Sequence, residues 1–331
     1  MRLVPITLSE IDRIEPLWLM LHAHHQTVAP ELAPYVSAAD SWAQRRSQYE
    51  VALSNGGICF LVERAGEDIA YAMAALRPEY RPATFATDGQ IGELLTLMVR
   101  PGHRGQRIGE MLYGAIAEAL RAAGARHQLV GAIPANQGAV RFYIRQGFAQ
   151  AWLTLTRFGR MPGGPAAGLG TMAKPVKPAE VDQLEPLWLT LHHHHQSVAP
   201  ALGPFVRDAA SWAVIRKLFL EASERELLLR IDEARQLVAL ACTVVSEDRE
   251  DLADTWQTGR QVAEIKILVT AAHMRGRGLG SELLHDVQRR LSARGIHDLM
   301  IGAIHANHRA VQLYQRHGFR PAWTEMIRFP R

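Results

Sequence analysis

Two short stretches of this sequence have the residue types of a phosphate-binding loop. The first reads RGQRIG from Arg104 to Gly109, and the second reads RGRGLG from Arg275 to Gly280. Each follows an apolar run and precedes a helical pattern. Glycines let the main chain approach a ligand closely, and the free amides at a helix start attract anionic oxygens. These loops therefore predict binding of a phosphate or diphosphate group.

The spacing of these loops excludes two other nucleotide-binding patterns. The dinucleotide fingerprint G-x-G-x-x-G requires glycines at different intervals. A Walker loop requires Gly-Lys-Ser/Thr, which neither stretch contains. By itself a glycine loop of this kind is a weak signal, so further features must support it.

A second pattern follows each loop by about 30 residues. It has the form Asn-x-x-Ala-Val-x-x-Tyr-x-x-x-Gly-Phe and begins at Asn136 and at Asn307. Its glycine suits the end of a helix, and its phenylalanine begins the next strand. Upstream, a glutamate precedes the loop arginine by the same interval in both places, at Glu93 and at Glu264.

Histidines cluster in two further matching stretches, HAHH from His22 and HHHH from His192. Neighbouring helical residues are turned by about 100° from each other, so four adjacent histidines cannot share one ion. Residues three apart could ligate together, but no acidic or cysteine residue stands nearby. We therefore predict no metal site.

All of these features occur twice because the chain repeats itself at a period of about 170 residues. Pro16 to Val36 and Pro186 to Val206, for example, are nearly the same sequence. Solenoid repeats are much shorter, so the repeated unit is a whole domain. We predict domains at residues 1–160 and 174–331. Residues 161–173, rich in Gly, Pro and Ala, form the predicted linker.

The composition is that of a globular protein with two cores. Of 331 residues, 48% are hydrophobic and 21% are charged, with a net charge of +4. This mild excess suits an anionic ligand, but no basic helix with interleaved aromatic residues indicates nucleic-acid binding. The two cysteines, Cys59 and Cys242, lie in apolar runs. Buried thiols favour a reducing cytoplasm, and we find no signal peptide and no apolar run of about 18 residues.

The same order of elements must position these residues in each half. In the first half we expect strands near 2–7, 58–63, 69–76, 93–99 and 129–133, then a terminal strand pair ending near Phe158. Helices are expected from Ser9 through Leu21 and near 41–53, 108–122 and 137–145. This alternation predicts an α/β fold with helices on both faces of a mixed sheet.

The loop and the Asn-to-Tyr helix, in fixed order, resemble the GCN5-related N-acetyltransferase (GNAT) family over nearly the whole chain. This resemblance implies two tandem domains, each a mixed sheet splayed open between its fourth and fifth strands. It implies acetyl-CoA as co-substrate, with pantetheine in the gap and no metal. It also implies direct acetyl transfer to a primary amine in a ternary complex, without a covalent enzyme intermediate.

The resemblance assigns cofactor contacts to the loops, to the strands before them and to the asparagines. These residues are Met98, Val99, Arg104, Gly105, Gln106, Arg107, Ile108, Gly109 and Asn136 in the first half. In the second half they are Val269, Thr270, Arg275, Gly276, Arg277, Gly278, Leu279, Gly280 and Asn307.

Catalytic roles follow from the same resemblance. Tyr143 and Tyr314 match the tyrosine that can protonate the departing thiolate, with helix packing as the alternative. Glu93 and Glu264 stand where several family members place a general base, with a solvated strand end as the alternative.

The first helix and its following turn usually wall the acceptor pocket in this family. His25 and His195 are therefore candidates for binding the acceptor or for acting as a base, and helix-end packing is the alternative.

The two halves differ at positions that matter for these roles. Arg107 stands where the second half has Gly278, so its side chain must point away from the phosphates or onto them. Lys266 follows Glu264 by two residues, on the same strand face, where it would weaken the carboxylate as a base.

The sequence thus predicts a cytoplasmic tandem N-acetyltransferase with at least one active half and with the halves packed as a pseudo-dimer. The alternative is an acetyl-CoA-binding sensor or structural protein. The amine acceptor stays open, because variable loops near 77–90 and 246–260 would build its pocket.

Overall fold

The computed structural model describes residues 1–77, 83–87, 89–159, 173–249 and 251–330. All of the strands within these ranges join one twelve-stranded sheet. Below, the first half means residues 1–159 and the second half residues 173–330.

Each half contributes strands and helices in the same order. The first half has strands β1 (Arg2–Pro5), β2 (Ile58–Arg64), β3 (Glu67–Arg77), β4 (Gln90–Val99), β5 (Ala125–Ala132) and β6 (Ala149–Arg157). Its helices are α1 (Glu15–Val28), α2 (Ala38–Ser54), α3 (Ile108–Ala122) and α4 (Gln137–Arg145). The second half has strands β7 (Lys174–Pro175), β8 (Leu228–Glu233), β9 (Gln236–Glu247), β10 (Gln261–Thr270), β11 (Asp298–Ile304) and β12 (Arg320–Arg328). Its helices are α5 (Glu185–Val198), α6 (Asp208–Glu224), α7 (Leu279–Ala293) and α8 (His308–Arg316).

Short polar side chains fix several helix starts. The Ser37 hydroxyl accepts a hydrogen bond from the Asp40 amide (3.1 Å) at the start of α2. The Asn136 and Asn307 side chains accept from amides in the first turns of α4 and α8. Such caps satisfy amides that have no partner within the helix.

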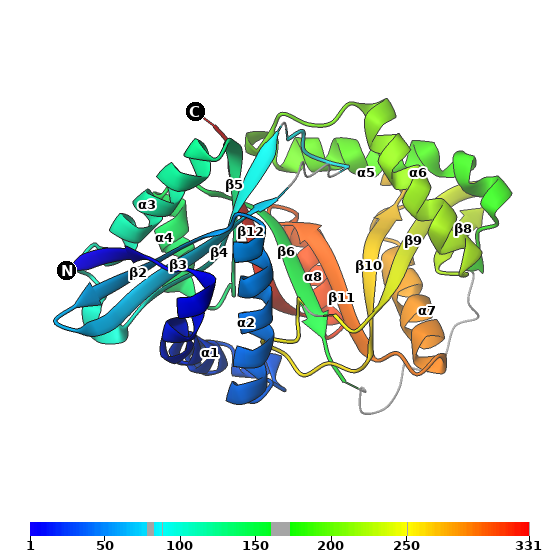
Figure 1. Cartoon of the computed structure of the whole chain (residues 1–331). Helices are drawn as coiled ribbons and strands as arrows, with labels where there is room; N and C mark the ends of the chain where they lie inside the picture. Colours follow the sequence, from blue (N-terminus) through cyan, green and yellow to red (C-terminus); the bar gives the residue numbers. More distant parts are fainter. Residues whose placement is uncertain (78–82, 88, 160–172, 250, 331) are drawn as a thin grey trace.

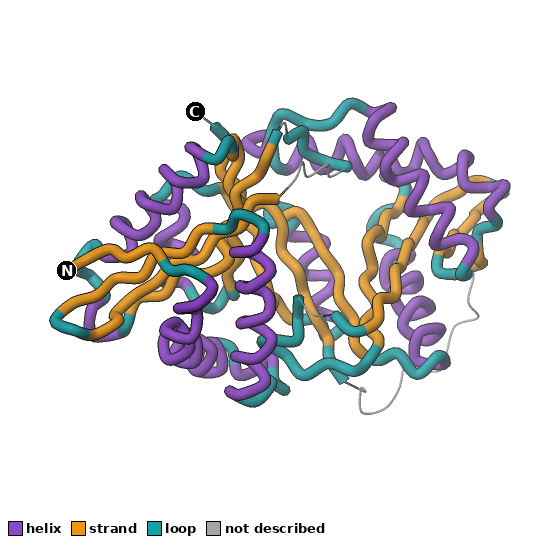
Figure 2. Tube along the Cα trace, in the orientation of Figure 1, coloured by secondary structure: helices purple, strands orange, loops and turns teal. Residues whose placement is uncertain are grey.

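Helices cover both faces of the sheet, as the sequence predicts (Figure 2). In the first half, α1 and α2 pack on one face, around Trp18 and Tyr49. Helices α3 and α4 pack on the other face, around Leu112 and Tyr143. The middle strand β3 is buried on both faces from Ile69 to Ala74, which explains its continuous apolar run.

The two halves exchange their last strands. The sheet order through the centre is β4-β5-β12-β6-β11-β10. Thus β12 of the second half pairs with β5 of the first, and β6 of the first half pairs with β11 of the second. In Figure 1 the exchanged strands lie in the middle of the molecule.

The two exchanged strands also pair with each other, antiparallel, and this pairing relates the halves by an approximate two-fold axis. Trp152 is the register partner of Glu325, and Thr154 is the partner of Trp323. These two pairs are equivalent, because Trp152 matches Trp323 and Thr154 matches Glu325 in the repeat. An isologous contact of this kind is typical of a symmetric dimer.

Loops from each half also pack on the helices of the other half. Tyr35 forms an isolated bridge with Trp256, and the matching bridge joins Phe85 and Phe205. Two apolar clusters, one with Leu32 and Trp256 and one with Phe85 and Leu202, fill the interface.

Each half of the sheet forks between its fourth and fifth strands, as expected. Strands β4 and β5 are parallel partners only as far as the pair Leu94 and Val130. Strands β10 and β11 part after Ile265 and Ile301. Below, the first fork is the opening between β4 and β5, and the second fork is the opening between β10 and β11.

Two details of the predicted elements are wrong. The expected terminal strand pair is a single strand in each half, because its partner comes from the other half. The first predicted helix begins as a 3₁₀ turn (Leu8–Ile14), and α1 then continues past Leu21 through the histidines to Val28.

The predicted domain division at residues 160 and 174 stays a prediction, and most of the predicted linker lies outside the described residues. The strand exchange means that neither segment completes a sheet with its own strands alone. Both cysteines are free and buried, as predicted.

Candidate functional site

A glycine loop leaves the open end of each fork and begins a helix. In the second half, Gly276 and Gly278 have φ of 81° and 88°, and α7 begins at Leu279. No atom lies within 4 Å of a Cβ built on either glycine. The first amides of α7 thus border open space, which is the arrangement of an anion site.

The first half has the same loop with a left-handed arginine. Gly105 has φ of 78°, and Arg107 has φ of 60° at the position of Gly278. The Arg107 guanidinium lies against Glu110 of α3 (Nε–Oε2 2.8 Å), and its side chain is 86% exposed. Arg107 therefore points along the helix surface, and the backbone path of the loop is retained.

The other loop residues are held by nearby groups. The Arg104 Nε donates to the carbonyl of Val99 (3.1 Å), which ties the loop to the end of β4. Gln106 accepts a hydrogen bond from Arg64 (2.7 Å). Arg277 forms a pair of hydrogen bonds with Glu233 (3.2 and 3.3 Å). The β2–β3 hairpin thus contacts the first loop, and the β8–β9 hairpin contacts the second.

The residues predicted to contact pantetheine lie beyond the fork points. Met98 and Val99 follow Leu94, the last residue of β4 that pairs with β5. Val269 and Thr270 follow Ile265, the last residue of β10 that pairs with β11. Their strands have no β-partner on the side of the fork. A strand edge of this kind can bond an extended ligand.

The predicted tyrosines are buried residues of the second motif's helices, α4 and α8. Tyr143 packs against Phe148, and Tyr314 packs against Phe319. Burial raises the pKa of both phenols well above the ordinary value. Each therefore keeps its proton near neutral pH, which a proton donor requires.

One histidine of each cluster lies at the glycine loop, which sequence reasoning did not single out. The pKa of His24 is lowered, mainly by burial and then by the Arg104 cation, while a hydrogen bond with Asn136 acts in the opposite direction. His194 has the same relation to Arg275 and Asn307. Near the end of α1 and of α5, a histidine thus lies close to both the loop arginine and the motif asparagine of the same half.

The predicted acceptor-binding histidines lie more deeply in the structure. Burial lowers the pKa of His25 and of His195 to about 3, so both imidazoles are neutral and weakly basic near pH 7. His195 packs edge-on against Trp152 of the exchanged strand β6, with ring centroids 5.6 Å apart. The adjacent His22 and His192 contact the carbonyls of Val36 and Val206 (3.1 and 2.8 Å).

The first fork carries a carboxylate pair on the face covered by α1 and α2. Glu93 of β4 forms an ion pair with Arg77 of β3. Glu325 of the exchanged strand β12 lies close enough that the Glu93 charge acts on it. Burial is the main cause, and Glu93 the second, of a rise in the pKa of Glu325 to about 7. No sequence pattern indicated that Glu325 lies here, because it belongs to the other half.

A buried polar cluster adjoins this carboxylate pair. The Tyr49 hydroxyl contacts the hydroxyls of Tyr71 (3.1 Å) and Thr96 (2.5 Å). Arg45 lies over the Trp18 ring, with its Cζ 4.2 Å from the centroid, and forms an ion pair with Asp254. Asp254 belongs to the second half, so this cluster is also completed across the interface.

The second half has apolar residues at the matching positions. Ile215, Phe219, Leu240 and Ile267 replace Arg45, Tyr49, Tyr71 and Thr96. Glu264 lies between Lys266 (2.7 Å) and Arg249 (3.6 Å), and Arg249 is also paired with Asp251. The polar cluster of the first half can be found in the sequence by looking for positions at which the two halves differ. The motifs that the halves share do not include it.

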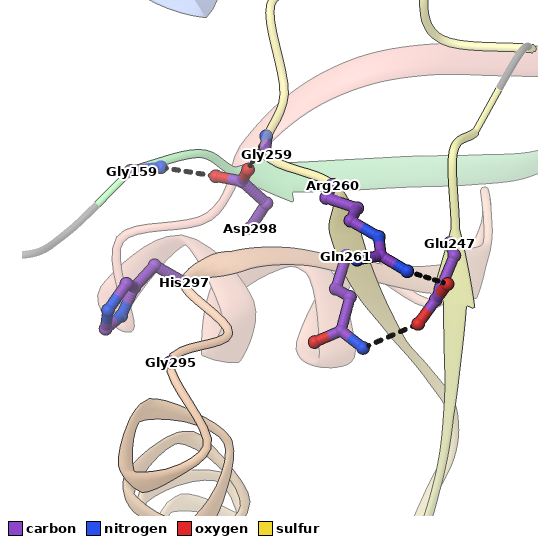
Figure 3. Close-up of a pocket in the computed structure, with 8 residues that line it drawn as sticks. All are labelled: Gly159, Glu247, Gly259, Arg260, Gln261, Gly295, His297 and Asp298. Atoms are coloured by element: carbon purple, nitrogen blue, oxygen red, sulfur yellow. Dashed lines mark hydrogen bonds and ion pairs between the residues drawn. The ribbon is translucent and has the colours of Figure 1, made fainter.

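A separate hollow of about 440 Å³ lies where the second half's parallel strands begin, away from the glycine loops (Figure 3). The Asp298 carboxylate there accepts hydrogen bonds from the amides of Gly159 (2.7 Å) and Gly259 (2.5 Å). Glu247 is hydrogen-bonded to Arg260 and Gln261. These polar groups satisfy one another, and the contacts hold the end of the first half against the second.

Two further properties bear on the site. Within the described residues, no group of histidine, cysteine and acidic side chains could hold a metal ion. In the same ranges, no helix is long and apolar enough to cross a membrane.

Comparisons with known proteins agree with this architecture. The model of the acetyltransferase (GNAT) family matches residues 21–148 and again 188–319. A comparison with curated proteins gives no match.

Two solved structures share the fold. A GCN5-related N-acetyltransferase from Sphaerobacter thermophilus aligns over 99% of this chain and 95% of its own, with a TM-score of 0.56 and 16% identity. A GCN5-related glucosamine N-acetyltransferase region of a fungal multi-domain GH3 β-N-acetylglucosaminidase aligns over 98% of this chain and 38% of its own. Its TM-score is 0.54, at 15% identity.

Proposed function

The chain belongs to the GNAT acetyltransferase family, with one family match in each half, and on this premise we propose that it transfers acetyl from acetyl-CoA to a primary amine. The observation that carries the proposal is the glycine loop at the open end of each forked sheet. The loop offers helix amides to a diphosphate, and the fork offers a free strand edge to the pantetheine chain.

In this proposal, binding of the co-substrate uses the predicted residues. The amides of residues 104–109 and 275–280 hold the diphosphate, while Met98, Val99, Val269 and Thr270 bond the pantetheine. His24, which lies beside Arg104 and Asn136, borders the same path. The loop arginines contribute positive charge, which favours an anionic ligand.

The proposed reaction is direct transfer in a ternary complex. The amine nitrogen attacks the thioester carbonyl carbon, the carbon–sulfur bond breaks and the electron pair leaves with sulfur. Tyr143 lies buried with its proton retained, so it can protonate the departing thiolate in the first half.

The first half is the better candidate for this chemistry. Its fork carries two carboxylates and a polar cluster, which can hold and deprotonate a cationic amine. At the second fork, Glu264 is already paired with Lys266 and faces Arg249, which leaves its carboxylate less free to accept an ammonium group. This difference favours acetyl-CoA binding without catalysis for the second half.

Calorimetry and a thiol-release assay test the proposal together. Titration of the whole chain with acetyl-CoA should show two sites. Thiol release should then rise with at least one of four probe amines: spermidine, kanamycin, lysine and a peptide with a free N-terminus.

Matched glycine variants assign the sites. We expect Gly105→Asp and Gly276→Asp each to remove one binding site, because a carboxylate in the loop repels the diphosphate. Gly56→Asp is the control, since Gly56 has a similar φ of 82° in an open turn before β2, at the opposite end of that strand from Arg64. A chain that binds no acetyl-CoA, or releases no thiol with any probe, contradicts the proposal.

A further inference from the structure

The exchanged strand β12 places a carboxylate from the second half at the first fork. Glu325 is the register partner of Gly131 in β5. Gly131 is the first residue of β5 beyond Val130, where the pairing with β4 ends. Glu325 therefore lies level with the point where the sheet opens, one strand away from the opening.

The face on which Glu325 lies is the one covered by α1 and α2. In β5, Val130 belongs to the apolar cluster beneath α3 and α4, so its neighbour Gly131 faces the opposite side. Paired residues on adjacent strands share a face, which puts Glu325 on the side of the polar cluster. Glu93 lies on the same side, because its neighbour Leu94 packs toward α3 and α4.

We infer that Glu325, delivered by the second half, is the general base of the acetyl transfer in the first half. This inference rests on the proposed function. It differs from the sequence prediction, which gave that role to Glu93. Glu93 is already held by Arg77 in an ion pair, and we assign it to positioning the acceptor and to tuning its neighbour.

The electrostatic surroundings suit this role. The charged groups that act on Glu325 are Glu93 of β4, which raises its pKa, and Arg77 of β3, which lowers it. On either side, the register partners of Glu325 are the uncharged Gly131 and Trp152. With a pKa of about 7, the carboxylate can accept a proton at neutral pH and release it again.

The second fork lacks such a group, because its matching position is Thr154 of the exchanged strand β6. A threonine hydroxyl does not accept a proton at neutral pH. The exchange thus gives the first fork a glutamate at this position and the second fork a threonine.

The proposed step balances as follows. The Glu325 carboxylate takes one proton from the ammonium group of the acceptor. The freed nitrogen lone pair forms the bond to the acetyl carbon, and the carbon–sulfur bond breaks. Tyr143 protonates the thiolate to give CoA thiol, and the second nitrogen proton replaces the one that Tyr143 donated. Glu325 then passes its proton to water, so an ammonium and a thioester give an amide, a thiol and one proton.

The test compares Glu325→Gln with the whole wild-type chain, using the most active of the four probe amines. In the wild type, kcat should rise with pH and level off above about pH 7. In Glu325→Gln, kcat at pH 8 should fall at least 100-fold, and the limb near pH 7 should disappear. Calorimetry should give the same acetyl-CoA affinity for both proteins. A loss of that affinity in the variant would mean a structural role and would overturn the inference.

Two further variants make the assignment specific. Glu93→Gln should move the limb of kcat to lower pH, because it removes the like charge that raises the pKa of Glu325. Glu118→Gln, the same chemical change on the exposed surface of α3, should keep the wild-type profile.

The outcomes separate the two proposals. An active wild type whose Glu325→Gln variant keeps kcat within threefold overturns the inference alone. A wild type that acetylates none of the probe amines overturns the proposed function, and the inference with it.

Discussion

At the scale of single residues, Glu325 combines a role in chemistry with a cost in stability. An unfolded chain ionises this carboxyl near pH 4.5, whereas the folded protein holds it protonated up to about pH 7. Below pH 4.5 the group is protonated in both states and contributes nothing. Between the two values, unfolding releases a proton, so rising pH favours the unfolded chain.

We therefore expect Glu325→Gln to stabilise the protein at neutral and alkaline pH. The gain should grow from none near pH 4.5 to about 3 kcal/mol above pH 7. Urea unfolding of both proteins across this range measures it, with Glu118→Gln as the control. A difference that does not change with pH would contradict the raised pKa.

The two glycine loops could be located from the sequence, whereas the polar groups at the first fork could not. Loop glycines such as Gly276 and Gly278 are recognisable, because a left-handed backbone selects glycine. Arg45 and Glu325 have no such local signature. Their surroundings depend on which strand and which loop of the other half lie beside them.

At the scale of elements, the loop between β9 and β10 packs on helix α2 and shields part of it from solvent. Asp254 of this loop forms an ion pair with Arg45 of α2, and both side chains are largely buried. Ser41 donates a hydrogen bond to the Asp254 carbonyl (2.5 Å). The matching contact in the other half joins Ser211 to the carbonyl of Ala83 (2.7 Å). The same contact between a loop and a helix of the other half thus occurs twice. It is charged where Asp254 meets Arg45, and apolar where Ala83 and Ile215 stand at the matching positions.

This pair of junctions supports a double-mutant prediction. Asp254→Ala alone should destabilise the chain by about 3 kcal/mol or more, because it leaves the Arg45 cation buried without its partner. Adding Arg45→Ile, which recreates the Ile215 and Ala83 combination of the other junction, should recover most of that loss. Chemical denaturation of the two single variants, Asp254→Ala and Arg45→Ile, and of the double variant measures the coupling. If the double variant loses the sum of the two single-variant losses in unfolding free energy, the ion pair between Arg45 and Asp254 is contradicted.

Most elements could be predicted from the sequence, because their apolar periods and caps are local. The run Ile69 to Ala74 indicated a buried strand, and Asn136 indicated a helix start. The exchange could not be predicted. Strands β6 and β12 have similar patterns of apolar residues, and neither pattern identifies the strand of the other half with which it pairs.

At the scale of the whole molecule, the exchange of β6 and β12 holds the two halves together by strand pairing, independently of the covalent linker. Strand β6 pairs with β11 and β12, and β12 also pairs with β5. Removing either half would expose strand edges and the apolar clusters around Trp256 and Phe85.

We expect a chain cut within residues 160–172 to stay whole under native conditions. A protease site inserted there should give two fragments in denaturing gels but one species in size-exclusion chromatography. That species should keep the unfolding midpoint of the uncut chain within a few degrees. Separation of the fragments at micromolar concentration would contradict the exchange.

The exchange of β6 and β12 also has a consequence for inheritance. After the duplication, a deletion of either copy removes a strand that the other needs, so selection keeps both. Beside its own fork, the second copy carries Phe219 and Ile267 where the first copy carries Tyr49 and Thr96. Its final strand, in contrast, places Glu325 in the sheet of its sibling. Substitutions in one gene segment therefore act on two different sites: those beside its own fork change the second half, and those in β12 change the first.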